Sequence, residues 1–268
     1  MQHSRNLTFN SKDFNLEDLL NIFSPISLPQ MNEYKFMDRV DTKFPFPSFH
    51  IPFILQSISD SYRVLEIEGN RNLPYHTTYL DTPESLLYLQ HVRGFSKRYK
   101  ARYRTYKITN NTFLEVKFRN TQKGTQKWRI ANQPVELNST KSQAFLATHL
   151  NNIARLLEPS IETHFSRVTL VGTSSKERVT LDFNLQFSNQ RNQWISLPHL
   201  AIAEIKREQS SHHSPLEGLL KKMLIRSTGF SKYCVGKTLL GEAPKPNSIK
   251  PKLLLLKRIE NEYNAYSA

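Results

Sequence analysis

Charged and apolar side chains alternate residue by residue through the middle of this chain, and this pattern restricts the fold more than any other feature. Successive side chains of a β-strand point to opposite faces of a sheet, so the spacing predicts strands with one polar and one apolar face. Residues 98–106 show it most clearly. Their polar set is Arg98, Lys100, Arg102, Arg104 and Tyr106, and the alternate set is Tyr99, Ala101, Tyr103 and Thr105.

The same alternation recurs in further segments that are separated by turn residues. Strands are predicted at residues 62–68, 75–81, 97–107, 112–119, 126–131, 163–171, 177–187 and 199–206. Apolar residues at helical spacing predict helices at residues 48–58, 83–91, 140–156 and 214–226. Short connections, such as the turn at residues 172–176, join strands in antiparallel fashion. The predicted class is therefore α+β.

The two ends of the chain differ in pattern from its middle. Residues 1–30 are predicted to form an N-terminal leader with a short helix within residues 13–23. Residues 31–240 form the main domain, and residues 241–268 a tail that carries a second short helix near its end. The leader and the tail are expected to pack on the main domain.

The polar faces of the predicted strands are mostly basic, in a chain whose formal net charge is +14. A solvated outer face is the alternative interpretation for any single strand. Enough amphipathic helices are present, however, to cover the apolar faces, which favours an eight-stranded antiparallel barrel with a basic interior. The like charges of such a tunnel repel one another, whereas a bound anion with several charges would neutralise them. The charge therefore indicates a polyanionic partner.

Several classes of protein are disfavoured by composition. The single cysteine, Cys234, excludes a disulfide framework and a cysteine-based zinc site, and it is interpreted as a core residue. The pair His212 and His213 is interpreted as part of a solvated loop. No apolar run is long enough to span a membrane, so a cytoplasmic protein is expected. A nucleic-acid partner is not expected, because the bases alternate within strands instead of forming a stripe with stacking aromatics.

Seven short motifs follow one another along the chain. They are residues 39–43 (RVDTK), 79–82 (YLDT), 100–106 (KARYRTY), 114–117 (LEVK), 178–182 (RVTLD), 204–206 (EIK) and 230–234 (FSKYC). In this order they resemble the VTC domain of polyphosphate polymerases, within the triphosphate tunnel metalloenzyme (CYTH-like) superfamily. The resemblance implies a tunnel barrel and a Mn²⁺- or Mg²⁺-dependent transfer of the γ-phosphate of ATP onto a growing polyphosphate chain.

The resemblance also implies roles for individual residues. It assigns catalytic phosphate contacts to Lys43, Arg102, Arg104, Lys117, Arg167, Arg178, Lys206 and Lys232. Glu204 would hold the metal. Asp182 is interpreted either as a second metal ligand or as the partner of an arginine. Together with the polar strand faces, the resemblance predicts substrate binding by Lys100, Lys127, Arg129 and Ser231.

Two other functions remain open at this level. Hydrolytic members of the superfamily begin with an ExExK pattern whose carboxylates bind metal, and such an enzyme would split tripolyphosphate or a nucleoside triphosphate. Here the comparable segment is Arg39-Val-Asp41-Thr-Lys43, with a base in place of one acid. A non-catalytic polyphosphate binder is the third hypothesis, although it would not require Glu204 among the bases.

Overall fold

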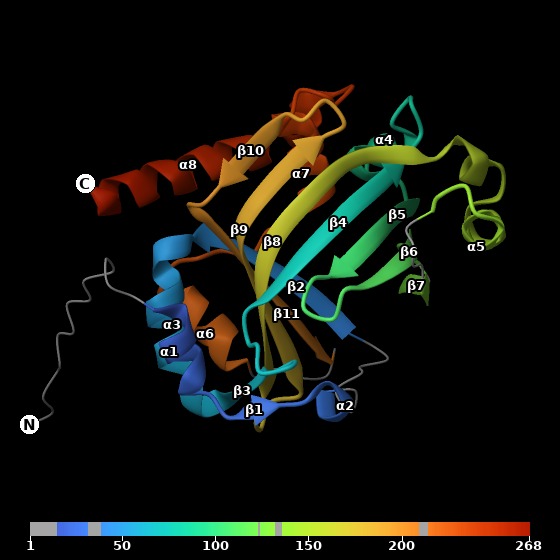
Figure 1. The fold of residues 1–268 in the computed structure, drawn as a ribbon. Coiled ribbons are helices and arrows are strands. Elements are labelled where there is room, and N and C mark those ends of the chain that lie inside the picture. Colours follow the sequence, from blue (N-terminus) through green and yellow to red (C-terminus); the bar gives the residue numbers. More distant parts are fainter. Residues whose placement is uncertain (1–14, 32–38, 123, 132–135, 209–213) are drawn as a thin grey trace, which may run out of the picture.

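The alternating segments form one strongly curved antiparallel sheet in the computed structural model of the chain (Figure 1). The structure describes residues 15–31, 39–122, 124–131, 136–208 and 214–268. Eight strands pair in the order β2-β11-β9-β8-β4-β5-β6-β7. In chain order these are β2 (Arg39–Pro47), β4 (Leu73–Asp81), β5 (Lys97–Tyr106), β6 (Asn111–Asn120), β7 (Gly124–Ala131), β8 (Glu158–Gly172), β9 (Glu177–Asn189) and β11 (Leu200–Glu208).

Helices and three short strands surround this sheet. The helices are α1 (Leu16–Asn21), α2 (Leu28–Met31), α3 (Ile51–Ile58), α4 (Leu86–Val92), α5 (Thr140–Leu150), α6 (Pro215–Lys222), α7 (Lys232–Leu239) and α8 (Lys250–Ser267). Short 3₁₀ segments occupy Ser48–His50, Ser59–Ser61, Asn151–Leu156 and Pro246–Ile249. The short strands β1 (Pro25–Ile26), β3 (Tyr62–Leu65) and β10 (Trp194–Leu197) pair at the margins of the sheet.

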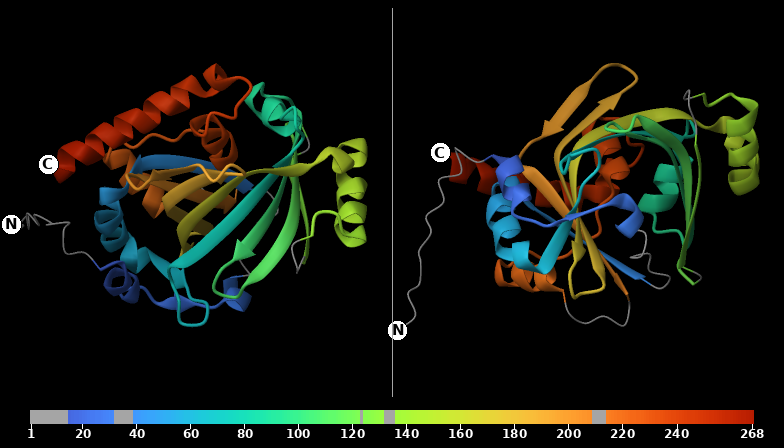
Figure 2. Two further views of the ribbon diagram at one scale, coloured as in Figure 1. Left: turned by 45° about the horizontal axis from the view of Figure 1, so that its top comes forward. Right: turned by 60° about the horizontal axis from the view of Figure 1, so that its bottom comes forward.

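The curved sheet is a half-barrel with β2 and β7 at its two ends (Figure 2). Its curvature brings the two ends of the strand order toward each other. Asp41 of β2 and Glu204 of β11 thus act electrostatically on Lys117, which lies on β6. The predicted α+β class and eight antiparallel strands flanked by helices are confirmed, and the predicted barrel takes the form of a half-barrel. The basic faces of the strands line its concave side.

The convex side is apolar in two separate areas, and each is covered by helices. Side chains of β2, β8, β9 and β11 pack against α1, α3 and α6 in the first area. Side chains of β4, β5 and β6 pack against α5 and the 3₁₀ turn that follows it in the second. These two cores bury the apolar half of the alternating pattern, so the charged half faces the concave side.

Helix α7 fills one part of the concave side. Its residues Tyr233, Cys234 and Val235 belong to a third core, together with apolar side chains from β4, β8 and β9. A bulge in β9 makes this possible. Asn184 has a positive φ of 52°, and beyond it Leu185 and Phe187 turn to the concave side. The predicted alternation in β9 is therefore correct as far as residue 183 and wrong beyond it.

Two predicted elements require correction, and three observed elements were not predicted. The strand predicted at 62–68 is the short β3, which lies outside the eight-strand order, and β2 takes its place. Strand β2 was not predicted because it contains two prolines, which are rare in central strands. An edge strand such as β2 tolerates prolines. The helix predicted at 140–156 continues as a 3₁₀ turn from Asn151. Like β2, the short strand β10 and the helix α7 were not predicted. The terminal helices were predicted, and they span Leu16–Asn21 and Lys250–Ser267.

Gly236 permits the close approach of α7 to the sheet. A Cβ atom at this position would lie 2.4 Å from Cδ1 of Phe187 and 2.8 Å from Cδ1 of Ile161. Both neighbours are fully buried, so neither can move aside easily. We expect Gly236→Val to lower the free energy of unfolding by about 1–3 kcal/mol because it overpacks this contact.

Urea denaturation measures this effect, and Gly218 in α6 supplies the matched control. A Cβ there meets no atom within 4 Å, so Gly218→Ala should raise the free energy of unfolding by about 0.4–1 kcal/mol. Equal effects of the two substitutions would contradict the described packing of α7.

Candidate active site

The predicted site residues come together on the concave side of the sheet and at the N-terminus of α7. Strand register places them: Lys43 pairs with Glu204 across β2 and β11, and Lys206 pairs with Arg178 across β11 and β9. Lys100 pairs with Lys117, and Lys117 in turn with Lys127, across β5, β6 and β7. Residues from widely separated segments therefore form one basic surface, here called the basic band. Its members are Lys43, Lys100, Arg102, Arg104, Lys117, Lys127, Arg129, Arg167, Arg178, Lys206 and Lys232.

Glu204 lies at the β2–β11 end of the basic band. Its Oε1 accepts a hydrogen bond from Nζ of Lys43 at 2.7 Å, and its Oε2 lies 2.8 Å from Nζ of Lys206. Burial alone would raise the pKa of this carboxyl, but the two lysines hold it well below the usual range. Glu204 is therefore an anion that draws two cations together.

Asp182 lies in the middle of the basic band and is almost fully buried. Arg167 donates to it twice, from Nε at 2.5 Å and from Nη2 at 2.7 Å. Lys232 of α7 donates to the same carboxylate. Burial opposes ionisation, yet these two cations hold the pKa of Asp182 well below its usual range. Of the two interpretations of Asp182, the structure shows the pair with an arginine.

Glu115 forms a third such centre on β6. Nη2 of Arg102 lies 2.7 Å from its Oε2, and Lys127 donates to its Oε1. Its carboxyl is 1% exposed and, despite burial, its pKa is held below the usual range by Arg102 and neighbouring cations. Each of the three acids thus orders two basic side chains, which leaves positive charge in excess across the band.

The N-terminus of α7 points at this surface. Nζ of Lys100 donates to Oγ of Ser231 at 3.0 Å. Ser231 also caps the helix, because its side chain accepts from the backbone N–H of Cys234 at 3.4 Å. A helix N-terminus carries partial positive charge and favours anions. The predicted Ser231 and Lys232 therefore join the basic band from a separate element.

The concave face of β4 supplies contacts that the sequence did not single out. The ring of Tyr75 lies 5.0 Å from the guanidinium carbon of Arg167 and 5.7 Å from that of Arg104. Oγ1 of Thr77 accepts from Nε of Arg104 at 3.4 Å. These side chains hold the arginines in place. The period-2 pattern of residues 75–81 was the signal that could have found them.

Arg129 lies at the β7 end of the basic band. Its guanidinium carbon is 4.8 Å from the centre of the Phe113 ring on β6. Strand register also sets it beside Glu115. The structure therefore brings this residue to the concave side, as the sequence predicted, at the margin of the half-barrel.

Two lysines of the band give a test of its electrostatics. Burial lowers the pKa of Lys100 to about 8, with Lys117 and Arg102 adding to the shift. Burial also lowers the pKa of Lys206 to about 8, although Glu204 opposes the change. An unfolded lysine titrates near 10.4, so between about pH 8 and 10 the unfolded chain binds more protons than the folded one. These two groups therefore make the folded state more stable as pH rises through this range.

The same titration has the opposite effect on anion binding. We expect the affinity for tripolyphosphate to fall at least several-fold between pH 7 and pH 9, because the two lysines lose their charge. Isothermal titration calorimetry at constant ionic strength measures this change. An affinity that stays constant over this range would show that these lysines do not face the anion.

The acids near Glu204 suit a hard divalent cation. Asp41 pairs with Lys206 in the strand register, and it acts on Lys117 together with Glu204. Mg²⁺ prefers oxygen ligands, and it is commonly held by one or two carboxylates and the phosphates of a substrate. Asp41 and Glu204 provide that donor set. The group of three metal-ligating side chains found within the described ranges lies elsewhere, on the convex side.

Comparison with known proteins agrees with the motifs. The family model of the VTC domain matches residues 38–240, and the chain therefore belongs to the VTC domain family. No curated protein matches the sequence. Within the described residues, no helix is long and apolar enough to cross a membrane.

Solved structures give distant likenesses. A proposed adenylate cyclase from Vibrio parahaemolyticus has a TM-score of 0.44 and 13% identity, covering 74% of this chain and 97% of its own. One from Bacillus halodurans has a TM-score of 0.46 and 12% identity, covering 73% and 94%. A Hippeastrum protein, described as a proposed adenylyl cyclase that has a dominant triphosphatase activity, has a TM-score of 0.44 and 16% identity, covering 75% of this chain and 96% of its own.

Proposed function

We propose that this protein is an ATP-dependent polyphosphate polymerase, which transfers the γ-phosphate of ATP onto a growing chain of inorganic polyphosphate. The observation that carries the proposal is the basic band itself. It runs along the inside of the half-barrel, from Lys43 on β2 to Arg129 on β7, and the carboxylates of Glu204, Asp182 and Glu115 hold its cations in place. Membership of the VTC domain family supports the same function.

A linear phosphate chain suits this surface better than a compact anion. Arginine binds phosphate oxygens through paired N–H donors, whereas lysine acts as a point charge. The band contains both types on seven strands and on α7, so successive phosphates would meet successive cations. The N-terminus of α7, with Ser231 and Lys232, would add donors at the point where Asp182 anchors Lys232.

The reaction requires little covalent chemistry from the protein. A terminal oxygen of the acceptor chain attacks the γ-phosphorus, the new P–O bond forms, the bond to the β,γ-bridging oxygen breaks, and ADP leaves. The attacking oxygen is already anionic at neutral pH, so no general base is needed. Phosphoryl transfer depends mainly on positioning and on stabilising charge. Arg102, Arg104 and Arg167 would do both, because their neighbours fix them before substrate arrives.

A divalent cation would be held by Glu204 and Asp41. Mn²⁺ or Mg²⁺ held there would neutralise charge on the phosphates. Lys43 and Lys206 contact Glu204 directly, so they keep its carboxylate ionised and directed into the half-barrel. Their ammonium groups would remain beside the same phosphates.

Product analysis tests the proposal. Purified protein is incubated with ATP and Mn²⁺, with an EDTA control, and the products are separated on a polyacrylamide gel. A ladder of long phosphate chains is the expected result. Inorganic phosphate as the sole product would instead identify a triphosphate hydrolase, and tight polyphosphate binding without turnover would identify a binding protein. Either result would overturn the proposal.

A further inference from the structure

A polar row crosses the convex side of the sheet between its two helix-covered areas. Strand register sets these residues side by side on five adjacent strands: Gln186, His164, His76, Thr105 and Thr112. Their sequence neighbours Tyr75, Thr77 and Arg104 face the concave side, so the row faces away from the basic band. The middle of this row carries two histidines, and Glu162 lies two residues before His164 on the same face.

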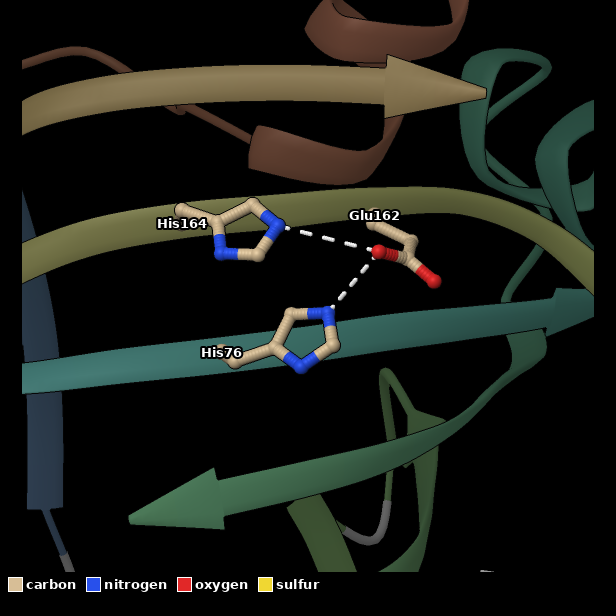
Figure 3. A group of neighbouring side chains, drawn as sticks. All are labelled: His76, Glu162 and His164. Carbon is tan, nitrogen blue, oxygen red and sulfur yellow. Dashed lines mark hydrogen bonds and ion pairs between the residues drawn. The ribbon is translucent and has the colours of Figure 1, made fainter. Parts of the chain in front are cut away.

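These three side chains converge (Figure 3). Nε2 of His76 lies 3.0 Å from Oε2 of Glu162, and Nε2 of His164 lies 3.6 Å from the same oxygen. One ligand atom from each residue lies within 4.8 Å of the other two. The side chains are 21–30% exposed, so the group lies close to the surface of the protein.

The hydrogen bonding of this group is incomplete. Nε2 of His164 is buried and makes no hydrogen bond, since its contact with Glu162 at 3.6 Å is too long for one. Two imidazole nitrogens also converge on one carboxylate oxygen, at a place where helices cover neither histidine. A buried polar atom without a partner is uncommon in folded proteins. A cation bound between the three groups would satisfy both nitrogens and the carboxylate together.

We propose that His76, Glu162 and His164 form a zinc site on the convex side of the sheet. Zn²⁺ binds imidazole nitrogen and carboxylate oxygen at about 2.0–2.2 Å, which places tetrahedral ligands about 3.3 Å apart. The observed separations of 3.0 and 3.6 Å bracket that value. Two histidines and one glutamate are also a ligand set that zinc uses when a fourth position stays open to water.

The histidine rings must tilt when the metal binds. They are stacked, with centroids 4.3 Å apart and an angle of 9° between their planes. A metal ion lies in the plane of each imidazole that binds it, so rotation about the Cβ–Cγ bonds would bring both nitrogens toward the ion. A hollow of about 230 Å³ is lined by Gln186, Trp194, Ile195 and Ser196, and Gln186 is the register partner of His164.

This site is separate from the divalent cation that the proposed reaction would use. Imidazole ligands favour zinc and related transition metals, whereas carboxylates with phosphate oxygens favour magnesium and manganese. The two sites lie on opposite faces of the sheet. Zinc would connect β4 to β8 and is not required for transfer of phosphate, so the proposal stands or fails independently of the polymerase function.

Calorimetric titration of the tag-free, full-length protein with Zn²⁺ tests the proposal. One saturable site per chain is expected, and Zn²⁺ should raise the melting temperature. Glu162→Gln and His76→Ala should each weaken binding more than about 10-fold, since each removes a ligand. The visible absorption of bound Co²⁺ should change in the same variants, which a merely structural role for these residues would not produce.

The double variant His212→Ala/His213→Ala is the control, because these two histidines are adjacent in the sequence and could themselves bind zinc. It should bind zinc as the natural protein does. The proposal would be overturned by the absence of saturable binding, by binding that survives both Glu162→Gln and His76→Ala, or by loss of binding in the control alone. Circular dichroism of each variant tests whether the fold is retained. Polyphosphate synthesis with Mn²⁺ should remain unchanged in His76→Ala.

Discussion

Glu204→Gln is expected to reduce ATP-dependent polyphosphate synthesis at least roughly 100-fold, the scale of effect seen when a charge-stabilising group is removed from an active site. Glutamine occupies the same space but carries no charge. Without a negative charge it would bind the divalent cation weakly. It would also leave the positive charges of Lys43 and Lys206, which contact the two carboxylate oxygens, without a counter-ion. The rate of ADP release with saturating ATP and Mn²⁺ measures the loss.

Binding and catalysis should respond in opposite directions. Removing a negative charge from the basic band should leave the affinity for tripolyphosphate unchanged or make it tighter, so the defect would be confined to the chemical step. Glu66→Gln is the matched control, because Glu66 pairs with Arg71 away from the basic band at 2.8 Å. Synthesis by Glu204→Gln at the natural rate would show that the metal assignment is wrong.

Asp182→Asn is expected to lower the free energy of unfolding by about 3–5 kcal/mol, because it leaves buried charges without a counter-ion. Asp182 is 2% exposed, and both Arg167 and Lys232 depend on its carboxylate. An amide can accept a hydrogen bond but cannot neutralise two cations. Urea denaturation at neutral pH measures the effect. Glu262→Gln, in an exposed pair on α8, should change stability by less than about 0.5 kcal/mol.

Anions should rescue this variant. Tripolyphosphate would supply the missing negative charge to Arg167 and Lys232, so it should raise the melting temperature of Asp182→Asn more than that of the natural protein. Sodium chloride at matched ionic strength separates this effect from general screening. If tripolyphosphate stabilises neither protein, the basic band is not an anion site.

The sequence predicted the concave surface well because strand periodicity follows directly from backbone geometry. Alternation alone assigned Arg102, Arg104 and Lys117 to one face, and the structure places them together. Alternation is a property of single strands, so it required no knowledge of how the strands pair. For Asp182 the sequence left open a second metal ligand or the partner of an arginine, and only the pairing of β8 with β9 shows the contact with Arg167.

Features that depend on pairing were not predicted. Helix α7 is short and contains Gly236, so its helical signal is weak until the sheet supplies Phe187 and Ile161 as packing partners. Beyond the bulge at Asn184, the side chains of β9 point to the opposite faces of the sheet from those that simple alternation predicts. The alternating pattern of the sequence gives no sign of this bulge. His76 and His164 are distant in sequence, and only the register of β4 against β8 sets them side by side.

Following the γ-phosphate of ATP tests the central claim most directly. The protein is supplied with ATP labelled at the γ-position, Mn²⁺ and a short polyphosphate primer, and the label is traced by gel electrophoresis while ADP is measured in parallel. The proposed function predicts that the label enters long phosphate chains and that each labelled phosphate incorporated is matched by one ADP. Label recovered entirely as inorganic phosphate, or retained in ATP, would contradict it.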